Sequence, residues 1–222
     1  MRVKQAIFLV GGRGTRLGAL SANTPKPMQE IAPGVRFLDV LLEHAARHGF
    51  TDIVLLAGHL GEQVEAAYHG KSIREAKVRV LREPEPMGTG GALKLFADVL
   101  DPSFILSNGD SFFDFNFRAL TAAPLEGLAR LALRRVDDVS RYGSVALADG
   151  CVTAFIEKNP ANNPLDRKNG IATAHLRLAD GLDHHRLAVG VVRRQRPDDP
   201  FPGRGNRPLP APGRLVTAGR HQ

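Results

Sequence analysis

The chain has 222 residues and 43% of them are hydrophobic, so it suits one α/β domain, or one domain followed by a tail. The single cysteine, Cys151, excludes a disulfide framework and favours a cytoplasmic protein, and the N-terminal apolar run is too short for a membrane span. The formal net charge of +7 would suit nucleic acid, but ten Arg and one Lys against five Asp lie within residues 161–222, so we do not expect the preceding residues to bind it.

Strand and helix patterns alternate over the first half of the chain. Short stretches dominated by apolar residues predict strands at Ala6–Val10, Ile53–Ala57, Val78–Leu81 and Phe104–Leu106, and Ile53–Ala57 is apolar throughout. The spacing of apolar residues predicts helices at Phe37–His48, Gly61–Tyr68 and Gly90–Val99. This alternation predicts an α/β fold, a Rossmann-like three-layer sandwich with a mostly parallel central sheet.

The middle of the chain carries weaker patterns. Leu128–Arg135 is compatible with a helix or a strand, because its periodicity fits both. Ser144–Leu147 and Val152–Glu157 predict an antiparallel hairpin with Asp149-Gly150 as its turn. Histidines at four positions lack metal-ligand spacing, and we expect most of them at the surface or at helix ends: His44, His48, His59 and His69.

A glycine-rich loop follows the first strand and reads Gly11-Gly12-Arg13-Gly14-Thr15-Arg16. Its glycines allow backbone N–H groups to approach a ligand closely, and Lys26 follows between two prolines. Backbone donors, a guanidinium and an ammonium together favour a phosphate-rich ligand. The Walker A motif is excluded because no Gly-Lys-Ser/Thr closes the loop, and the spacing Gly12, Gly14, Gly18 excludes the dinucleotide fingerprint.

Two further segments follow the third and fourth predicted strands. The first, residues 82–91, contains Glu83, whose carboxylate could accept both the N1–H and the N2–H of guanine. The second is Asn108-Gly109-Asp110, where a carboxylate at a strand end is well placed for Mg²⁺. Ligands of parallel α/β sheets bind at the carboxyl ends of the strands, so we expect the three segments to converge on one edge.

Two stretches resemble the signature of the sugar nucleotidyltransferases, G-x-G-T-R-L and then P-K-P: they are Gly12-Arg13-Gly14-Thr15-Arg16-Leu17 and Pro25-Lys26-Pro27. The chain particularly resembles the mannose- and heptose-1-phosphate guanylyltransferases, over residues 1–158. The resemblance implies an enzyme that joins a sugar 1-phosphate to a nucleoside triphosphate, with GTP favoured, and releases pyrophosphate with Mg²⁺ as cofactor. Its product would supply cell-surface polysaccharide or glycan synthesis, and a homo-oligomer is left open.

The resemblance also assigns roles to individual residues. The implied catalytic residues are Arg16, Lys26 and Asp110, with Asp110 as the metal ligand. The implied nucleotide-binding residues are Leu9, Gly11, Gly12, Gly14, Thr15, Glu83, Gly88 and Thr89. The residues implied to bind the sugar phosphate are Asn108, Gly109, Tyr142, Gly143, Glu157 and Lys158.

Beyond Lys158 the resemblance ends, and neither the family's second metal aspartate nor its later sugar-binding segment can be placed. We therefore expect a nucleotidyltransferase domain over residues 1–160 that lacks the C-terminal part of the fold. Residues 161–222 are expected to form a basic tail rich in Arg, Pro and Gly, which is mostly disordered. The tail could be a polyanion-binding extension, a linker, or out-of-frame translation, and we favour the last.

Two alternatives to the enzyme come from other classes of protein. The first is a nucleotide-binding protein without turnover, regulatory or decayed, which is supported by the missing second metal carboxylate and the missing sugar-binding segment. The second is a nucleic-acid-binding protein, which only the basic tail supports. Its binding to nucleic acid would depend on the salt concentration.

Overall fold

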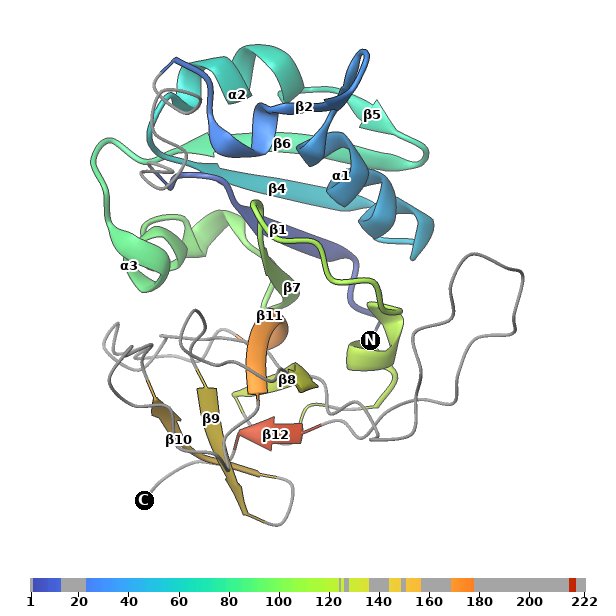
Figure 1. Ribbon diagram of the computed structural model, residues 1–222, viewed down its shortest axis with the longest axis vertical. Coiled ribbons are helices and arrows are strands. Elements are labelled where there is room, and N and C mark those ends of the chain that lie inside the picture. The colour runs from blue at the N-terminus through green and yellow to red at the C-terminus, as the bar shows by residue number, and fades with distance from the viewer. Residues whose placement is uncertain are drawn as a thin grey trace.

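The computed structural model describes residues 2–12, 23–123, 125, 128–135, 144–148, 151–156, 169–177 and 216–218. Within these residues, ten strands form one sheet around which the helices pack (Figure 1). In spatial order they are β5 (Ser72–Ile73), β6 (Ala76–Arg82), β4 (Asp52–Ala57), β1 (Gln5–Leu9), β7 (Ser103–Asn108), β11 (Asn169–Arg177), β8 (Ala129–Arg135), β12 (Val216–Ala218), β10 (Cys151–Ile156) and β9 (Ser144–Ala148). The expected α/β fold is confirmed.

The N-terminal half of the sheet is parallel, with β6, β4, β1 and β7 pairing in that order. The inner strands β4 and β1 are almost entirely buried because both of their faces are covered, whereas β6 alternates buried apolar residues with more exposed charged ones. Helices α1 (Phe37–Arg47) and α2 (Gly61–Tyr68) lie on one face, and α3 (Gly88–Leu95) lies on the other (Figure 1). Since α3 joins β6 to β7, the chain changes face and direction there, and β7 pairs with the free edge of β1.

Helices α1 and α2 are joined through one carboxylate. The backbone N–H of Arg36 donates to Oδ2 of Asp39 over 2.8 Å, which caps the N-terminus of α1. The hydroxyl of Tyr68, at the end of α2, donates to Oδ1 of the same Asp39 over 2.7 Å. Gly49 ends the turn after α1 with a φ of 75°, a conformation that suits glycine.

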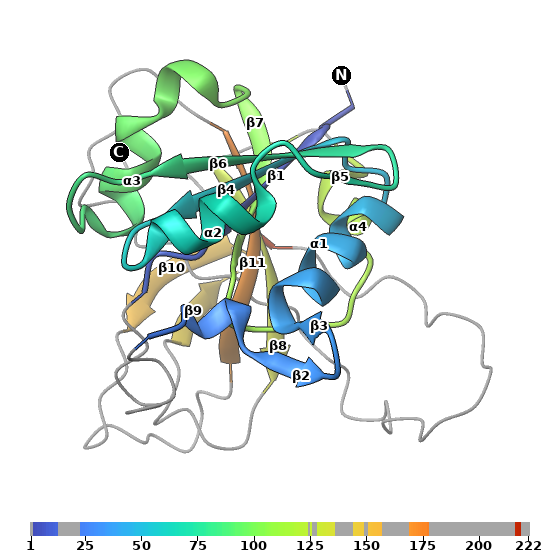
Figure 2. The same ribbon diagram turned by 90° about the horizontal axis from the view of Figure 1, so that it is seen from above.

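Shorter elements surround this core. They are η2 (Lys26–Met28), β2 (Glu30–Ala32), β3 (Val35–Arg36), η3 (Ala97–Val99) and α4 (Arg118–Thr121). Strands β2 and β3 pair into a small hairpin beside α1 (Figure 2). Within the described part of the chain, none of the helices has the length and apolar character needed to cross a bilayer.

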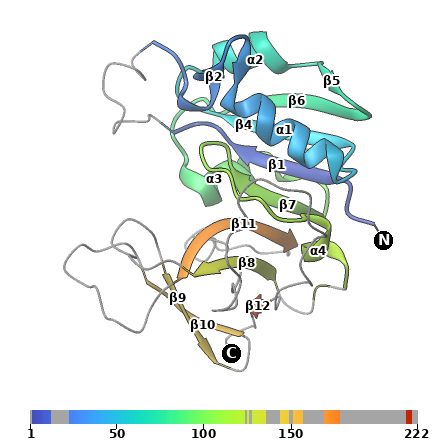
Figure 3. The same ribbon diagram turned by 45° about the vertical axis from the view of Figure 1, so that its right-hand side comes forward.

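The other half of the sheet is largely antiparallel. Strand β11 lies between β7 and β8 and runs antiparallel to both (Figure 3). The expected hairpin is confirmed as β9 paired with β10, and the segment left open between helix and strand is the strand β8. We expected a tail from residue 161, but Asn169–Arg177 is instead a strand inside the sheet.

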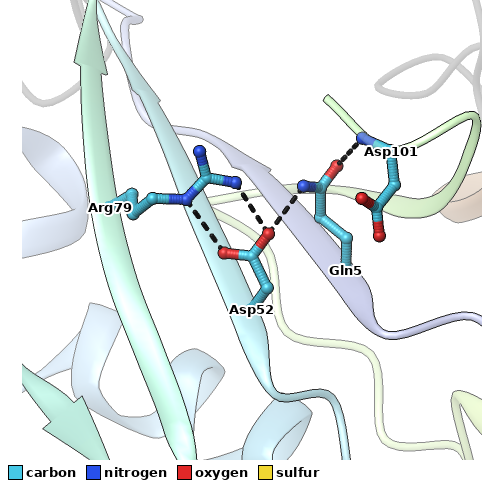
Figure 4. A network of polar contacts seen from close by, with 4 residues as sticks. All are labelled: Gln5, Asp52, Arg79 and Asp101. Carbon is cyan, nitrogen blue, oxygen red and sulfur yellow. Dashed lines mark hydrogen bonds and ion pairs between the residues drawn. The ribbon is translucent and has the colours of Figure 1, made fainter. Parts of the chain in front are cut away.

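A polar network lies at the amino ends of the parallel strands, opposite the edge at which the motifs were expected (Figure 4). The side-chain amide of Gln5 is fully buried and donates to Oδ2 of Asp52 over 2.7 Å. The carbonyl oxygen of that amide accepts the backbone N–H of Asp101 over 2.9 Å. Arg79 donates to both carboxylate oxygens of Asp52, over 3.0 and 2.7 Å. The network therefore joins β1, β4, β6 and the entrance to β7.

Replacing Gln5 with Leu is expected to lower the free energy of unfolding by about 1–3 kcal/mol, because the Asp101 N–H and one Asp52 oxygen lose buried partners. Urea unfolding followed by far-UV circular dichroism measures this loss. The matched control is Glu43→Gln, which removes an exposed ion pair with Arg74 and is expected to leave the unfolding midpoint unchanged. Equal midpoints for Gln5→Leu and the wild-type chain would contradict the proposed role of the network.

Candidate functional site

A cavity of about 470 Å³ lies at the carboxyl ends of the parallel strands. Leu9 of β1 is in register with Leu56 of β4 and with Asn108 of β7, so the three strands end at the same level. The cavity lies where the strand order changes direction, which is the usual ligand site of such sheets. Nine of the residues expected to form the site line it: Leu9, Gly11, Gly12, Lys26, Glu83, Gly88, Thr89, Asn108 and Asp110.

Lys26 is presented to this cavity by the Pro-Lys-Pro segment. Pro25 and Pro27 are buried, and the N–H of Met28 donates to the carbonyl of Pro25 over 2.8 Å. The backbone around Lys26 is thereby anchored, while its side chain keeps 36% of its surface exposed. Its ammonium Nζ lies 2.8 Å from Oδ2 of Asp110, and that carboxylate is 42% exposed.

The turn that carries Asp110 depends on close packing at Gly109, which is buried beside β1. The N–H of Gly109 donates to the carbonyl of Leu9 over 2.8 Å. A Cβ atom on Gly109 would lie 2.4 Å from Cγ1 of Val10 and 2.8 Å from the carbonyl oxygen of Leu9. Only glycine fits without movement, so Gly109 acts here through backbone packing that holds Asp110 at the strand end.

Glu83 lies where the glycine-rich loop meets the end of β4. A Cβ on Gly11 would lie 2.8 Å from the backbone nitrogen of Gly58 and 3.1 Å from Oε1 of Glu83. The second carboxylate oxygen, Oε2, accepts the N–H of Met87 over 3.0 Å. The expected base-contacting residue therefore also closes the turn before α3, an additional role that sequence reasoning missed.

Seven residues expected in the site lie outside the described residues: Gly14, Thr15, Arg16, Tyr142, Gly143, Glu157 and Lys158. Their roles stay predictions. Sequence reasoning also missed the apolar wall of the cavity, which includes Val10, Pro27, Leu56, Pro86 and Ala92. The sequence signal that could have found them is their position, because they lie at the strand ends or within the three segments that carry the glycines and prolines.

The donor set at the cavity suits a magnesium site that the substrates complete. Among the described residues, no group of three or more His, Cys, Asp and Glu side chains could bind a metal. Asp110 offers a hard, accessible carboxylate, and Asn108 lines the same cavity. Magnesium in phosphoryl-transfer sites takes one or two carboxylates together with substrate phosphates and water, so one accessible carboxylate at this cavity is compatible with it.

A histidine and phenylalanine cluster supports the segment after Asp110. His44 lies in the last turn of α1, one of the two kinds of position expected for the histidines, and it is buried there. Its Nε2 lies 3.0 Å from the carbonyl oxygen of Phe115. Its ring makes edge contacts with Phe112, Phe117 and His48, at centroid distances of 5.2, 4.7 and 4.5 Å. Helix α1 thereby holds the chain that leaves the Asp110 turn.

Burial lowers the pKa of His44 below its ordinary value of 6.5, and burial with the neighbouring His44 lowers the pKa of His48. The Asp114 carboxylate opposes both shifts, whereas Arg47 adds to them. Below pH 6.5 the unfolded chain binds more protons at these two positions than the folded chain does. The stability that the neutral, buried forms of His44 and His48 contribute is therefore fully present above pH 6.5. It is lost as the pH falls from 6.5 towards the lower pKa values of the folded state.

The variant His44→Gln tests this pH dependence, because Gln retains an N–H donor but does not titrate. The unfolding free energy of the wild-type chain is expected to fall between pH 7 and about pH 5, and that of the variant to fall less steeply. Urea unfolding at a series of pH values measures both slopes. Identical slopes would show that His44 does not contribute to the acid sensitivity.

The cavity lies at the switch point of a parallel sheet, where α/β proteins usually bind their ligands, and Lys26 and Asp110 face each other in it. The family model of the nucleotidyl transferases matches residues 5–175, and the chain belongs to this family. The match includes most of β11, in agreement with the place of that strand in the sheet.

Within this family, the chain is similar to several guanylyltransferases. The chain is 33% identical over 157 residues to the D-glycero-alpha-D-manno-heptose 1-phosphate guanylyltransferase of Aneurinibacillus thermoaerophilus, covering 69% of this chain and 67% of that protein. It is 34% identical over 155 residues to the same-named protein of Campylobacter jejuni, covering 69% and 68%. The catalytic subunit beta of mannose-1-phosphate guanylyltransferase from Drosophila melanogaster is 34% identical over 165 residues, and the match spans 43% of its length.

Solved structures agree with these relatives. HddC from Yersinia pseudotuberculosis, complexed with GMP-PN, superposes with a TM-score of 0.65 at 30% identity, covering 80% of this chain and 77% of that one. A putative glucose-1-phosphate thymidylyltransferase from Bacillus anthracis has a TM-score of 0.66 at 19% identity, which shows a shared fold.

Proposed function

We propose that the chain is a sugar-1-phosphate guanylyltransferase, which joins GTP to a sugar 1-phosphate and releases pyrophosphate. The observation that carries the proposal is the cavity that Lys26, Glu83 and Asp110 line together with Gly11 and Gly12, the described start of the glycine-rich loop. Guanylyltransferases among the relatives at 33–34% identity support the base and the reaction.

In this reaction an oxygen of the sugar phosphate attacks the α-phosphorus of the nucleotide in line with the departing pyrophosphate. The protein contributes positioning and charge neutralisation, and no covalent intermediate is needed. The Lys26 ammonium would stabilise the phosphate charge, and Asp110 would hold Mg²⁺, which when bound neutralises charge on the phosphates. Arg16 is assigned to the triphosphate by its motif.

The guanine base would lie beside Glu83. One carboxylate oxygen accepts the Met87 N–H, and a carboxylate oxygen has further lone pairs for the N1–H and N2–H of guanine. Uracil offers one ring N–H to such a group. Glu83 therefore favours GTP over UTP, with Gly88 and Thr89 lining the same side of the cavity.

The acceptor side is assigned from motifs. Tyr142, Gly143 and Glu157 would contact the sugar, and Lys158 would bind its phosphate. The guanylyltransferases to which the chain is similar are named for heptose or mannose 1-phosphate, so these two are the proposed acceptors.

The test is pyrophosphate release from a matrix of GTP, UTP, CTP and ATP with mannose 1-phosphate and D-glycero-α-D-manno-heptose 1-phosphate, in the presence of Mg²⁺. The proposal expects release with GTP and at least one of these acceptors. Release with UTP or CTP in preference to GTP would refute the assigned base, and release with none of the pairs would refute the reaction.

A further inference from the structure

The ion pair between Lys26 and Asp110 joins segments 84 residues apart and lies inside the candidate site. Lys26 Nζ donates to Oδ2 of Asp110 over 2.8 Å, and the hydroxyl of Ser111 donates to Oδ1 over 3.1 Å. Both oxygens of the proposed metal ligand therefore have a donor from this chain, and one of the two donors is a cation.

A divalent cation and an ammonium compete for the same carboxylate oxygen. Each is attracted to Asp110, but the two cations repel each other at the separation that a shared oxygen imposes. The carboxylate can therefore exchange one partner for the other far more readily than it can hold both.

We propose that Lys26 is the resident counterion of Asp110 in the metal-free protein and is displaced from it when a divalent cation binds. Binding of the cation to Asp110 then frees the Lys26 ammonium to contact the phosphates of the nucleotide. The metal ion and the ammonium therefore become available to the phosphates together. This inference rests on the proposed function, because that function requires a metal ion at Asp110.

The surroundings of the pair suit such an exchange. Lys26 and Asp110 keep 36% and 42% of their side-chain surface exposed, so their ion pair is weak and screened by salt. Pro25 and Pro27 are buried and anchor the backbone, whereas the ammonium lies at the end of a flexible four-carbon chain. The lysine can therefore leave the carboxylate without movement of the backbone.

Binding of Mn²⁺ in the absence of nucleotide, measured by electron paramagnetic resonance at low ionic strength, tests the exchange. Lys26→Gln is expected to bind Mn²⁺ about three- to tenfold more tightly than the wild-type chain, because the competing charge is gone. Lys26→Arg retains the cation and is expected to bind close to the wild-type affinity, whereas Asp110→Asn is expected to lose this binding. Lys77→Gln, at the opposite edge of the sheet, makes the same charge change and is expected to bind as the wild type does.

A second readout uses the unmodified chain. Acetylation of Lys26 by an amine-reactive ester, followed by peptide mass spectrometry, is expected to accelerate on addition of Mn²⁺, with Lys77 as the internal reference. Equal or weaker Mn²⁺ binding by Lys26→Gln, including no binding by either protein, would overturn the exchange, and so would an unchanged acetylation rate. If the wild-type chain releases pyrophosphate but Lys26→Gln binds Mn²⁺ with unchanged affinity, the exchange is refuted and the proposed function is not. If Lys26→Gln binds Mn²⁺ more tightly but the wild-type chain releases no pyrophosphate, the proposed function is refuted and the exchange is not.

Discussion

Replacing Asp110 with Asn is expected to lower the rate of pyrophosphate release by about a hundred- to a thousandfold, or about 2.7–4 kcal/mol of transition-state stabilisation. The substitution keeps the shape of the side chain but removes its charge, so the site loses both the proposed metal ligand and the anion that Lys26 contacts. Because the carboxylate is 42% exposed, the folded state is expected to lose little stability.

Steady-state kinetics with GTP, the preferred sugar 1-phosphate and Mg²⁺ measure this effect, with urea unfolding as the check on folding. Asp98→Asn is the matched control, since Asp98 is an exposed acid in η3 outside the residues that line the cavity. Activity within threefold of the wild-type rate in Asp110→Asn would mean that Asp110 is not the residue on which the phosphate chemistry depends.

Replacing Gly109 with Ala is expected to affect stability and activity together. The added methyl group would collide with Cγ1 of Val10 and with the carbonyl of Leu9, so the turn has to move away from β1. Such overpacking costs about 1–3 kcal/mol of unfolding free energy. Because the same turn carries Asp110, the rate of pyrophosphate release is expected to fall as well.

Two glycines provide controls for the cause of this loss. Among the residues that the structure describes, no atom lies within 4 Å of a Cβ added at Gly12, so Gly12→Ala is expected to keep its stability. Gly34 has the same open surroundings but a φ of 72°, so Gly34→Ala measures backbone strain without collision. Equal unfolding free energies for Gly109→Ala and Gly12→Ala would contradict the steric argument.

The parallel half of the fold could be predicted from the sequence because its strands are short stretches dominated by apolar residues and separated by helical patterns. The run Ile53–Ala57 is such a case, and the structure extends it by one residue as Asp52–Ala57. Short exposed strands such as β2 carry no such pattern and were not predicted. Strand β11 was missed because its pairing with β7 and β8 is decided by tertiary contacts rather than by its own composition.

The part of the candidate site that depends on local motifs and on sheet topology could be predicted from the sequence. Parallel strands bring their carboxyl ends to one edge, and the structure does place Lys26, Glu83 and Asp110 around one cavity. The bond between Glu83 and the Met87 N–H was not predictable, because it depends on the path of a turn. The burial of His44 against Phe117 likewise depends on packing between segments far apart in the sequence.

The measurement that tests the central claim most directly is GTP binding and pyrophosphate release on one sample of the chain in the presence of Mg²⁺. Calorimetry before the sugar 1-phosphate is added gives the binding stoichiometry, and a coupled phosphate assay after a saturating amount is added gives the turnover. We predict that GTP binds at one site per chain and that pyrophosphate is released over many turnovers. Binding of GTP without any release of pyrophosphate would contradict the proposed enzyme and would favour a nucleotide-binding protein without turnover.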